Sequence, residues 1–331
     1  MTVSTAERKR IAIVGISHWH LPLYLGGFES ADVAGVWDSD WNRTRGFAEA
    51  VGATPYSSRE ALLDQEIDLA FIFGDPWEML ASSKQCVRRN ISFSVEKPAA
   101  PSLPELVELT REAEAAGVPA FVPLVFRTGG LPRAIAQLGR VRDMYAQYLT
   151  GPSSRYTAAG FDWAVTQSVL GAGSLQNLAP HFVDLFSLAT GAGDHDVEYL
   201  CAPQPESGEA DEKAHVVLQS QSGSSASIDV GYTTPHTAVS VGPRVVLTGT
   251  HGALVVDEAG AELLRPDGTS STPDRDLSLR WGELYPAYVR AVLAAAGTEL
   301  PLPHLSDLRD IYRVLDARFG QGATEQGVVS N

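Results

Sequence analysis

Short apolar runs alternate with segments of helical periodicity over about the first 125 residues. The runs are continuous, as in strands that a parallel sheet buries on both faces, and they predict strands at Arg8–Gly15, Asp32–Trp37, Asp68–Phe73, Ile91–Glu96 and Val118–Phe126. Helices are predicted between them at Leu21–Ser30, Asn42–Val51, Ser58–Leu63, Trp77–Arg89 and Ser102–Ala116. This alternation predicts a doubly wound parallel sheet.

The pattern changes after this point, so we place a domain boundary there and expect domains at 1–125 and 126–331. Two helices are predicted at Gly130–Leu138 and Ser174–Ala189, with a strand at Val141–Thr150 between them. Strands then follow one another without helices, at Val197–Cys201, Ala214–Ser220, Ala226–Tyr232, Val245–Thr248, Ala253–Asp257 and Glu262–Arg265. Such a run predicts an α+β domain with a large, mostly antiparallel sheet. Helices near Gly282–Ala296 and Ser306–Phe319 close the chain and are candidates to pack on the first domain.

Composition narrows the range of partners. The chain has 331 residues, 44% of them hydrophobic, and a net charge of -15, which argues against nucleic acid because phosphate binding needs a basic face. Cys86 and Cys201 lie far apart, so a reducing compartment fits better than a disulfide framework. Neither a signal peptide nor the about 20 apolar residues of a membrane span is found. We expect a cytoplasmic protein that binds no membrane.

The strand that begins at Ile91 ends in Glu96-Lys97-Pro98. A lysine placed there lies at the carboxyl edge of the sheet, where open α/β folds bind ligands. The proline holds the preceding residue in extended geometry, which gives Lys97 a defined direction. The alternative is a solvated loop lysine beside a chain-reversing proline.

The loop after the first strand occupies the place of a dinucleotide fingerprint. Gly15 permits the tight turn, but Ser17 and His20 stand where G-x-G-x-x-G has its other glycines. Asp38 ends the second strand about 20 residues on, as the ribose-binding acid does, and this favours NAD over NADP. Arg43 and Arg45 lie close enough in sequence to soften that preference.

His18 and His20 suggest a metal-binding pair, but no third ligand with suitable spacing lies near them in the sequence. We therefore expect local packing or a ligand contact and no metal site.

A second motif begins at Gly171-Ala172-Gly173 and continues as a helix. Asn177 and His181 are four residues apart and share one helix face, which Asp184 can also join. Histidine is the natural acid or base near neutral pH, whereas an amide can hold a hydroxyl but cannot take a proton. The alternative is a core helix with a hydrogen-bonded histidine.

Together these motifs resemble the Gfo/Idh/MocA family of nicotinamide-dependent oxidoreductases, and the resemblance covers nearly the whole chain. The family has an E-K-P tripeptide after a Rossmann strand and a glycine-rich opening to a helix with D-x-x-x-H. This sequence has Glu96-Lys97-Pro98, and Gly171-Ala172-Gly173 before Asn177 and His181. The resemblance implies an N-terminal Rossmann domain, a C-terminal domain with an open sheet, and pairing of subunits through that sheet as a homo-oligomer.

The resemblance also implies an activity, an NAD(P)-dependent dehydrogenase for a sugar, cyclitol or similar polyol. Lys97 would contact the reacting hydroxyl and the nicotinamide ribose, and His181 would move the hydroxyl proton, with Asn177 as the third catalytic candidate. Arg127 and Asn177 would contact substrate, and Trp163 lies in a loop that forms either a pocket wall or a core plug. The residues implied to bind the cofactor are Gly15, Ser17, His18, His20, Asp38, Asp75, Glu96, Lys97 and Pro98.

Three positions depart from the family pattern. The fingerprint has one glycine, Asn177 replaces the usual aspartate, and Asp75 and Leu80 replace the threonine and histidine of a T-P-x-x-x-H turn. These departures keep two alternatives open. One is a regulatory protein that binds a nucleotide or sugar without turnover, and the other is a lyase or glycosidase that uses transient oxidation by tightly held NAD.

Overall fold

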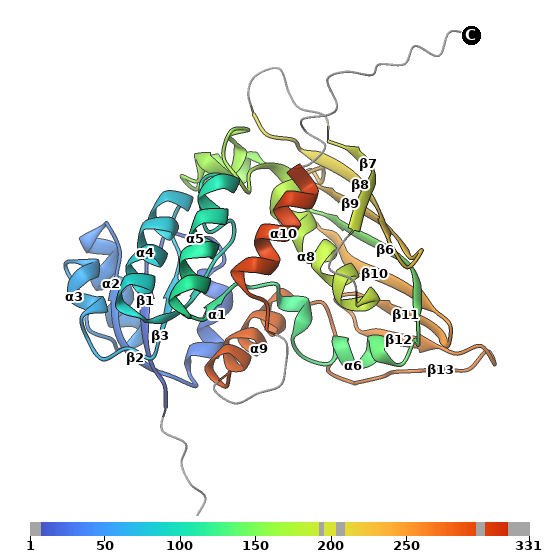
Figure 1. Cartoon of the computed structure of the whole chain (residues 1–331), viewed down its shortest axis with the longest axis horizontal. Coiled ribbons are helices and arrows are strands. Elements are labelled where there is room, and N and C mark those ends of the chain that lie inside the picture. Colours follow the sequence, from blue (N-terminus) through green and yellow to red (C-terminus); the bar gives the residue numbers. More distant parts are fainter. Residues whose placement is uncertain (1–7, 192–194, 203–208, 296–301, 317–331) are drawn as a thin grey trace, which may run out of the picture. The chain divides into compact units, whose positions relative to one another are not determined.

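The computed structural model describes residues 8–191, 195–202, 209–295 and 302–316 (Figure 1). The chain divides into two compact units. The first contains the residues up to Gly129 together with Arg280–Leu308, and the second contains Gly130–Leu279 together with the residues from Arg309 on.

The first unit is built on a five-stranded parallel sheet with the strand order β2-β1-β3-β4-β5. The strands are β1 (Arg10–Val14), β2 (Asp32–Trp37), β3 (Leu69–Ile72), β4 (Ser92–Val95) and β5 (Ala120–Phe121). The chain moves outward in one direction from β1 and in the other from β3, so the topological switch point lies between these two strands. The predicted doubly wound parallel sheet is confirmed.

Helices cover this sheet. They are α1 (Leu21–Phe28), α2 (Trp41–Val51), α3 (Arg59–Leu63), α4 (Pro76–Arg89), α5 (Leu103–Ala116) and, from the end of the chain, α9 (Trp281–Leu293). Tyr24 and Phe28 of α1 pack against Phe71 of β3, and α9 packs closely against α1 at Gly27. Right-handed crossovers place α4 and α5, which pack together, on the opposite face (Figure 1).

Local signals mark several of these helix ends. Ser58 and Ser102 accept hydrogen bonds from the backbone N–H groups of Ala61 and Glu105, so both predicted serine caps are confirmed. The strand predicted at 118–126 is much shorter than expected. Pro119 and Pro123 have no N–H to donate, and only Ala120–Phe121 joins the sheet before a 3-10 helix at Val125–Arg127.

The second unit contains an eight-stranded sheet in the order β13-β12-β11-β10-β6-β9-β8-β7. The strands are β6 (Val141–Leu149), β7 (His195–Cys201), β8 (Lys213–Ser220), β9 (Ser225–Gly231), β10 (Val241–Gly249), β11 (Gly252–Val256), β12 (Ala261–Leu264) and β13 (Ser270–Ser271). The β6–β9 pair is parallel and the other pairs of neighbouring described strands are antiparallel, so the predicted mostly antiparallel sheet is confirmed.

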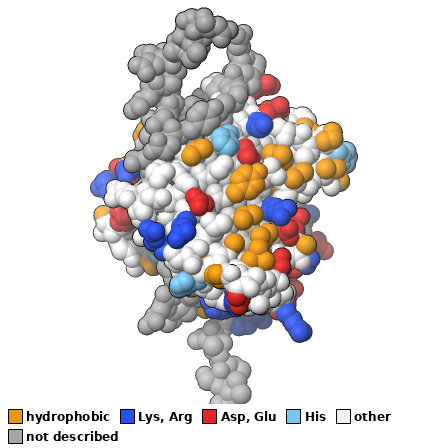
Figure 2. Space-filling view, turned by 90° about the vertical axis from the view of Figure 1, so that its right-hand side faces the viewer, with side chains coloured by type: hydrophobic (Ala, Val, Ile, Leu, Met, Phe, Trp, Pro, Cys, Tyr) orange, Lys and Arg blue, Asp and Glu red, His pale blue; other side chains and the backbone are white. Residues whose placement is uncertain are grey.

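One face of this sheet carries the long helix α8 (Gly173–Thr190), which packs on β6, β8 and β9. The helices α6 (Leu131–Ala136), α7 (Ser154–Ala158) and α10 (Leu305–Asp316) complete the described elements with a 3-10 helix at Asp162–Val165. Along β8 and β9 buried residues alternate with partly exposed ones, as in a sheet with a core on one side. Apolar side chains gather on the outer face among polar ones (Figure 2).

Among the described helices, none is long and apolar enough to cross a bilayer.

A glycine is required where β1 ends. Gly15 has φ +77°, and its N–H donates to the carbonyl of Trp37 over 2.7 Å. A Cβ atom at this position would lie 2.6 Å from the carbonyl oxygen of Phe73, at the end of the neighbouring strand β3. The turn and the strand packing therefore both depend on the missing side chain.

Gly15→Ala should destabilise the protein more than Gly117→Ala does. Gly117 has a similar φ of +66° but open space around it, so both variants lose about 1 kcal/mol for the left-handed conformation. Crowding against Phe73 adds about 1–3 kcal/mol at Gly15 only. Urea unfolding measures both losses, and equal values for the two variants would contradict the close approach.

Candidate functional site

The carboxyl edge of the parallel sheet collects the predicted cofactor-binding residues. Gly15, Ser17, His18 and His20 follow β1, Asp38 follows β2, Asp75 follows β3, and Glu96, Lys97 and Pro98 follow β4. Four loops that are separate in the sequence thus reach one edge because the strands are parallel. His18, Asp38, Glu96, Lys97 and Pro98 are buried, and Ser17, His20 and Asp75 are partly exposed.

The Glu96 carboxylate is buried and well supplied with donors. Its Oε1 accepts a hydrogen bond from the Tyr24 hydroxyl at 2.7 Å and lies 3.2 Å from His20 Nδ1. Its Oε2 accepts from the backbone N–H of Lys97 at 3.1 Å. The Tyr285 hydroxyl, from α9, lies 3.0 Å from His20 Nδ1. Sequence reasoning missed both tyrosines, because no local pattern links Tyr285 to residues that far back in the chain.

Burial shifts the pKa values of this group. It lowers the pKa of the Lys97 ammonium to about 8, although Glu96 opposes the shift. Burial also lowers the pKa of His18 to about 3, so this imidazole is neutral at physiological pH. Burial alone would raise the pKa of Glu96, but the nearby basic groups, His20 first among them, together outweigh it and hold that pKa below its ordinary range. Lys97 therefore titrates in a pH range near neutral, where it can both donate and accept a proton.

Asp38 connects three segments. Its Oδ2 accepts from the backbone N–H of Ile16 at 2.8 Å, which holds the loop after β1. Its Oδ1 accepts from the N–H of Asp40 at 2.8 Å and lies 3.1 Å from Nη2 of Arg43. Asp75 caps α4 by accepting from the N–H of Glu78 at 2.8 Å.

In the second unit, α8 carries Asn177 and His181 one turn apart, and both side chains are buried. Nδ2 of Asn177 donates to the hydroxyls of Tyr156 (3.1 Å) and Tyr232 (2.7 Å). The Tyr232 hydroxyl in turn donates to the Gly173 carbonyl at 3.1 Å. The guanidinium of Arg155 lies over both tyrosine rings, at 4.7 and 5.1 Å from their centres. Asn177 therefore connects the start of α8 to α7.

Asp211 fixes the start of α8. Its Oδ2 accepts from the Ser174 hydroxyl at 2.6 Å and from the Leu175 N–H at 2.9 Å, and its backbone carbonyl accepts from the Ser174 N–H. Gly173 has φ +76°, and a Cβ there would collide with the Asp211 carboxylate. Gly173 of the motif is thus explained by this cap. Sequence reasoning missed Asp211 because a loop residue more than 30 positions away gives no capping signal.

Two further residues with a predicted role in substrate binding have structural contacts. Arg127 ends the 3-10 helix of the first unit and forms an ion pair with Asp307, with 2.9 Å between Nη2 and Oδ1. Trp163, in the second unit, packs against a small apolar cluster of Val169, Ala172 and Ala210.

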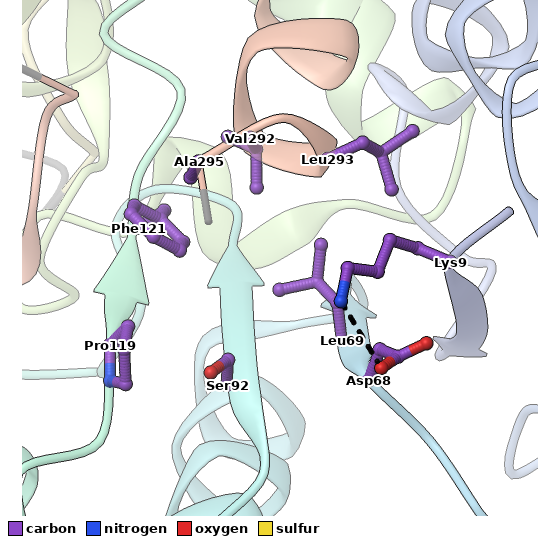
Figure 3. Close-up of a pocket in the computed structure, with 9 residues that line it drawn as sticks. All are labelled: Lys9, Asp68, Leu69, Ser92, Pro119, Phe121, Val292, Leu293 and Ala295. Carbon is purple, nitrogen blue, oxygen red and sulfur yellow. Dashed lines mark hydrogen bonds and ion pairs between the residues drawn. The ribbon is translucent and has the colours of Figure 1, made fainter. Parts of the chain in front are cut away.

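A separate pocket of about 190 Å³ lies at the opposite, amino-terminal edge of the parallel sheet (Figure 3). The ends of β3, β4, β5 and α9 line it, and Lys9 and Asp68 form an ion pair of 3.4 Å on its wall. It includes none of the residues named above for the cofactor or substrate. Ligands of open α/β sheets bind at the other edge.

Comparison with protein families gives two matches that together span most of the chain. Residues 9–123 match the Gfo/Idh/MocA oxidoreductase family, NAD-binding Rossmann fold, and residues 134–255 match the Gfo/Idh/MocA C-terminal domain. No curated protein matches the sequence.

Solved structures share the fold over nearly the full length. A UDP-N-acetylglucosamine 3-dehydrogenase from Acidithiobacillus ferrooxidans is 17% identical, with a TM-score of 0.76 over 94% of this chain and 97% of its own. An inositol dehydrogenase homolog from Azotobacter vinelandii, complexed with NAD+, is 16% identical, with a TM-score of 0.74 over 94% of both chains. A 3-ketoreductase from Actinomadura kijaniata, in complex with NADP and TDP-benzene, is 15% identical, with a TM-score of 0.72 over 94% and 96%. At these identities the likeness is one of fold.

Asn177→Asp should destabilise the protein at neutral pH by about 1–3 kcal/mol. A carboxylate cannot donate, and the Tyr232 proton is already used by Gly173. Because burial raises the pKa of the new carboxyl group, the loss should shrink as the pH falls and the group regains a proton to donate.

Denaturant unfolding at pH 5 and pH 7 measures this effect. Asn42→Asp is the matched control, since Asn42 is exposed in the first turn of α2, where a negative charge is neutral or favourable. An Asn177→Asp protein as stable as wild type at pH 7 would show that the amide hydrogens are dispensable.

Proposed function

Because the chain belongs to the Gfo/Idh/MocA family of oxidoreductases, we propose that it is an NAD-dependent dehydrogenase acting on CH–OH groups. Its substrate would be a sugar, a cyclitol or a similar polyol, oxidised at a hydroxyl carbon or reduced at the corresponding ketone. The dehydrogenases and ketoreductase of the same fold support this substrate class by their names. The observation that carries the proposal is Lys97, a buried cation beside Glu96 at the carboxyl edge of an NAD-binding fold.

The residues at this edge fit a dinucleotide. Gly15 leaves room at the end of β1, where a Cβ atom would fill the turn and crowd the backbone that a pyrophosphate must approach. Asp38 is the acid at the end of β2 that would accept hydrogen bonds from ribose hydroxyls. Asp75 and Glu78 add acidic groups nearby, whereas Arg43 adds a positive charge. The excess of carboxylates favours NAD, because each of them repels the 2′-phosphate of NADP.

We assign proton handling to Lys97 and His181. NAD, when bound, supplies the hydride acceptor, and the protein orients the substrate and moves the hydroxyl proton. A lysine with a pKa of about 8 can hold the substrate hydroxyl and exchange a proton near neutral pH. His181 is the acid or base on α8, and Asn177 acts through Tyr156 and Tyr232, which it holds in place.

A second candidate is a regulatory protein that binds a nucleotide or sugar without turnover. The observation that favours it is Asn177, which stands at the family's aspartate position and whose amide donates to two tyrosines. NAD binding in calorimetry without turnover on any polyol, sugar or nucleotide sugar would favour this candidate over the dehydrogenase.

We also propose that the protein forms a homo-oligomer through the outer face of the second unit's sheet. Tyr145, Val241 and Leu264 are large apolar residues exposed on β6, β10 and β12. Figure 2 shows apolar side chains gathered on one face of the molecule. Sedimentation of a monomer at micromolar concentration would contradict this assembly. The cytoplasmic location remains our expectation from the sequence.

Wild-type protein should bind NAD in calorimetry and reduce it with at least one member of a polyol and sugar panel, followed by absorbance of reduced nicotinamide. Lys97→Met and His181→Ala should each lower kcat by about 10²–10⁴-fold, as expected for loss of an acid or base. In the oxidation direction, kcat/KM should rise with pH through about 8, as the Lys97 ammonium loses its proton.

The rise of kcat/KM with pH through about 8 should be absent in Lys97→Met. Lys84→Met and His251→Ala are matched controls, because Lys84 pairs with Glu112 at the surface of α4 and His251 is exposed in a turn. The proposal fails at its first step if neither NAD nor NADP binds. Wild-type rates in either variant would remove that residue from the mechanism.

Asp38→Ala should weaken NAD binding more than NADP binding, because it removes both a ribose acceptor and a charge that repels the 2′-phosphate. It also frees Arg43, which can then pair with that phosphate. The two dissociation constants are measured by calorimetry, with Asp40→Ala as the control for the adjacent exposed acid. Equal losses for the two cofactors would argue against ribose contact.

A further inference from the structure

Two imidazoles and one carboxylate converge at the end of β1 and β4. His18, His20 and Glu96 each offer one ligand atom, and these atoms all lie within 4.8 Å of one another. The spacing of His18 and His20 suggests a pair, and the folded sheet supplies Glu96 as the third ligand, 76 residues after His20 in the chain.

We propose that His18, His20 and Glu96 bind one divalent transition-metal ion of the Zn²⁺ type. Two histidines and one carboxylate are a donor set for zinc and for similar ions, and three protein ligands leave at least one coordination position for water or another ligand. The site goes beyond the dehydrogenase activity and does not depend on it.

The geometry is close to what such an ion requires. Ligand bonds of about 2.1 Å place tetrahedral ligand atoms about 3.4 Å apart. His20 Nδ1 and Glu96 Oε1 are already 3.2 Å apart, and the rings of His18 and His20 have centres 5.1 Å apart. Nδ1 of His18 accepts a hydrogen bond from the His20 N–H at 3.2 Å, and metal binding through Nε2 would keep this bond. Side-chain movements of about an ångström would complete the site.

The protonation states also suit a metal ion. Metal ligands must be deprotonated, so affinity is lost wherever a proton competes. Burial lowers the pKa of His18 to about 3, and the nearby basic groups together hold the pKa of Glu96 low against the effect of burial. The His18 imidazole and the Glu96 carboxylate are therefore already in the forms that bind a metal ion at pH 7. The ammonium of Lys97 adds a positive charge that opposes a cation here.

Outer contacts orient two of the three ligands. The Tyr24 hydroxyl donates to Glu96 Oε1 at 2.7 Å, and the backbone N–H of His20 donates to Nδ1 of His18 at 3.2 Å. Such contacts from outside the ligand set orient the ligands and tune affinity. The side chain of His20 is 18% exposed, whereas that of Glu96 is fully buried, so an ion would enter past His20.

The test uses the full chain, stripped of metal by a chelator and free of dinucleotide. Titration with ZnCl₂ in a calorimeter should show one ion bound per chain, and Co²⁺ should give visible absorption bands of a nitrogen- and oxygen-ligated site. His18→Gln and Glu96→Gln should each weaken binding at least about tenfold. His251→Gln, which changes an exposed turn residue, should bind as wild type.

An unchanged affinity in His18→Gln, or no binding of either ion at millimolar concentration, would overturn the proposal. Should the variants unfold, anomalous diffraction from wild-type crystals soaked in Zn²⁺ decides the question without them. A peak among the three side chains supports the site, and a peak elsewhere or none overturns it. Zinc binding without any NAD binding would keep this site and remove the dehydrogenase proposal.

Discussion

A carboxylate that is buried loses its water, and it stays ionised only if donors replace that water. Glu96 meets this requirement with the Tyr24 hydroxyl, the Lys97 N–H and the His20 imidazole, and His20 in turn contacts Tyr285. These groups come from α1, from the end of β4, from the loop after β1 and from α9. The position of Lys97, the loop that would cradle a pyrophosphate and the proposed metal site all depend on this one buried charge.

The second unit also contains a buried polar side chain that needs hydrogen-bond partners, but this side chain, Asn177, is neutral. Asn177 lies where the family has an aspartate, but two tyrosine hydroxyls face it, and one of them donates to the Gly173 carbonyl. An amide nitrogen has two hydrogens and can satisfy both oxygens, which a carboxylate cannot do. The substitution therefore has a structural reason within this unit. His181, on the same helix face, is the proposed acid or base.

Much of the fold could be predicted because its signals are local. Apolar runs, serine caps and stop residues give β1 to β4, α3 and α5 nearly to the residue. The predictions were weaker for segments whose secondary structure depends on pairing with distant parts of the chain. The strand expected at 118–126 keeps only two residues in the sheet, and α7 and β13 were not predicted, because each is too short to have a periodic pattern.

The fold class and the residues at the strand ends could be read from the sequence, because both follow from periodicity and spacing along the chain. The family resemblance rests on two motifs, Glu96-Lys97-Pro98 and the glycine-rich start of the helix with Asn177 and His181. Only the tertiary structure decided which groups those residues meet. It brought Tyr285 to His20, Asp211 to the start of α8 and Glu96 to the histidine pair. Such partners are distant in sequence, and a hydrogen bond or ion pair between distant positions leaves no local pattern. Lys97 was thus visible in the sequence as a candidate, whereas its full burial, which lowers its pKa against the opposing effect of Glu96, is seen only in the structure.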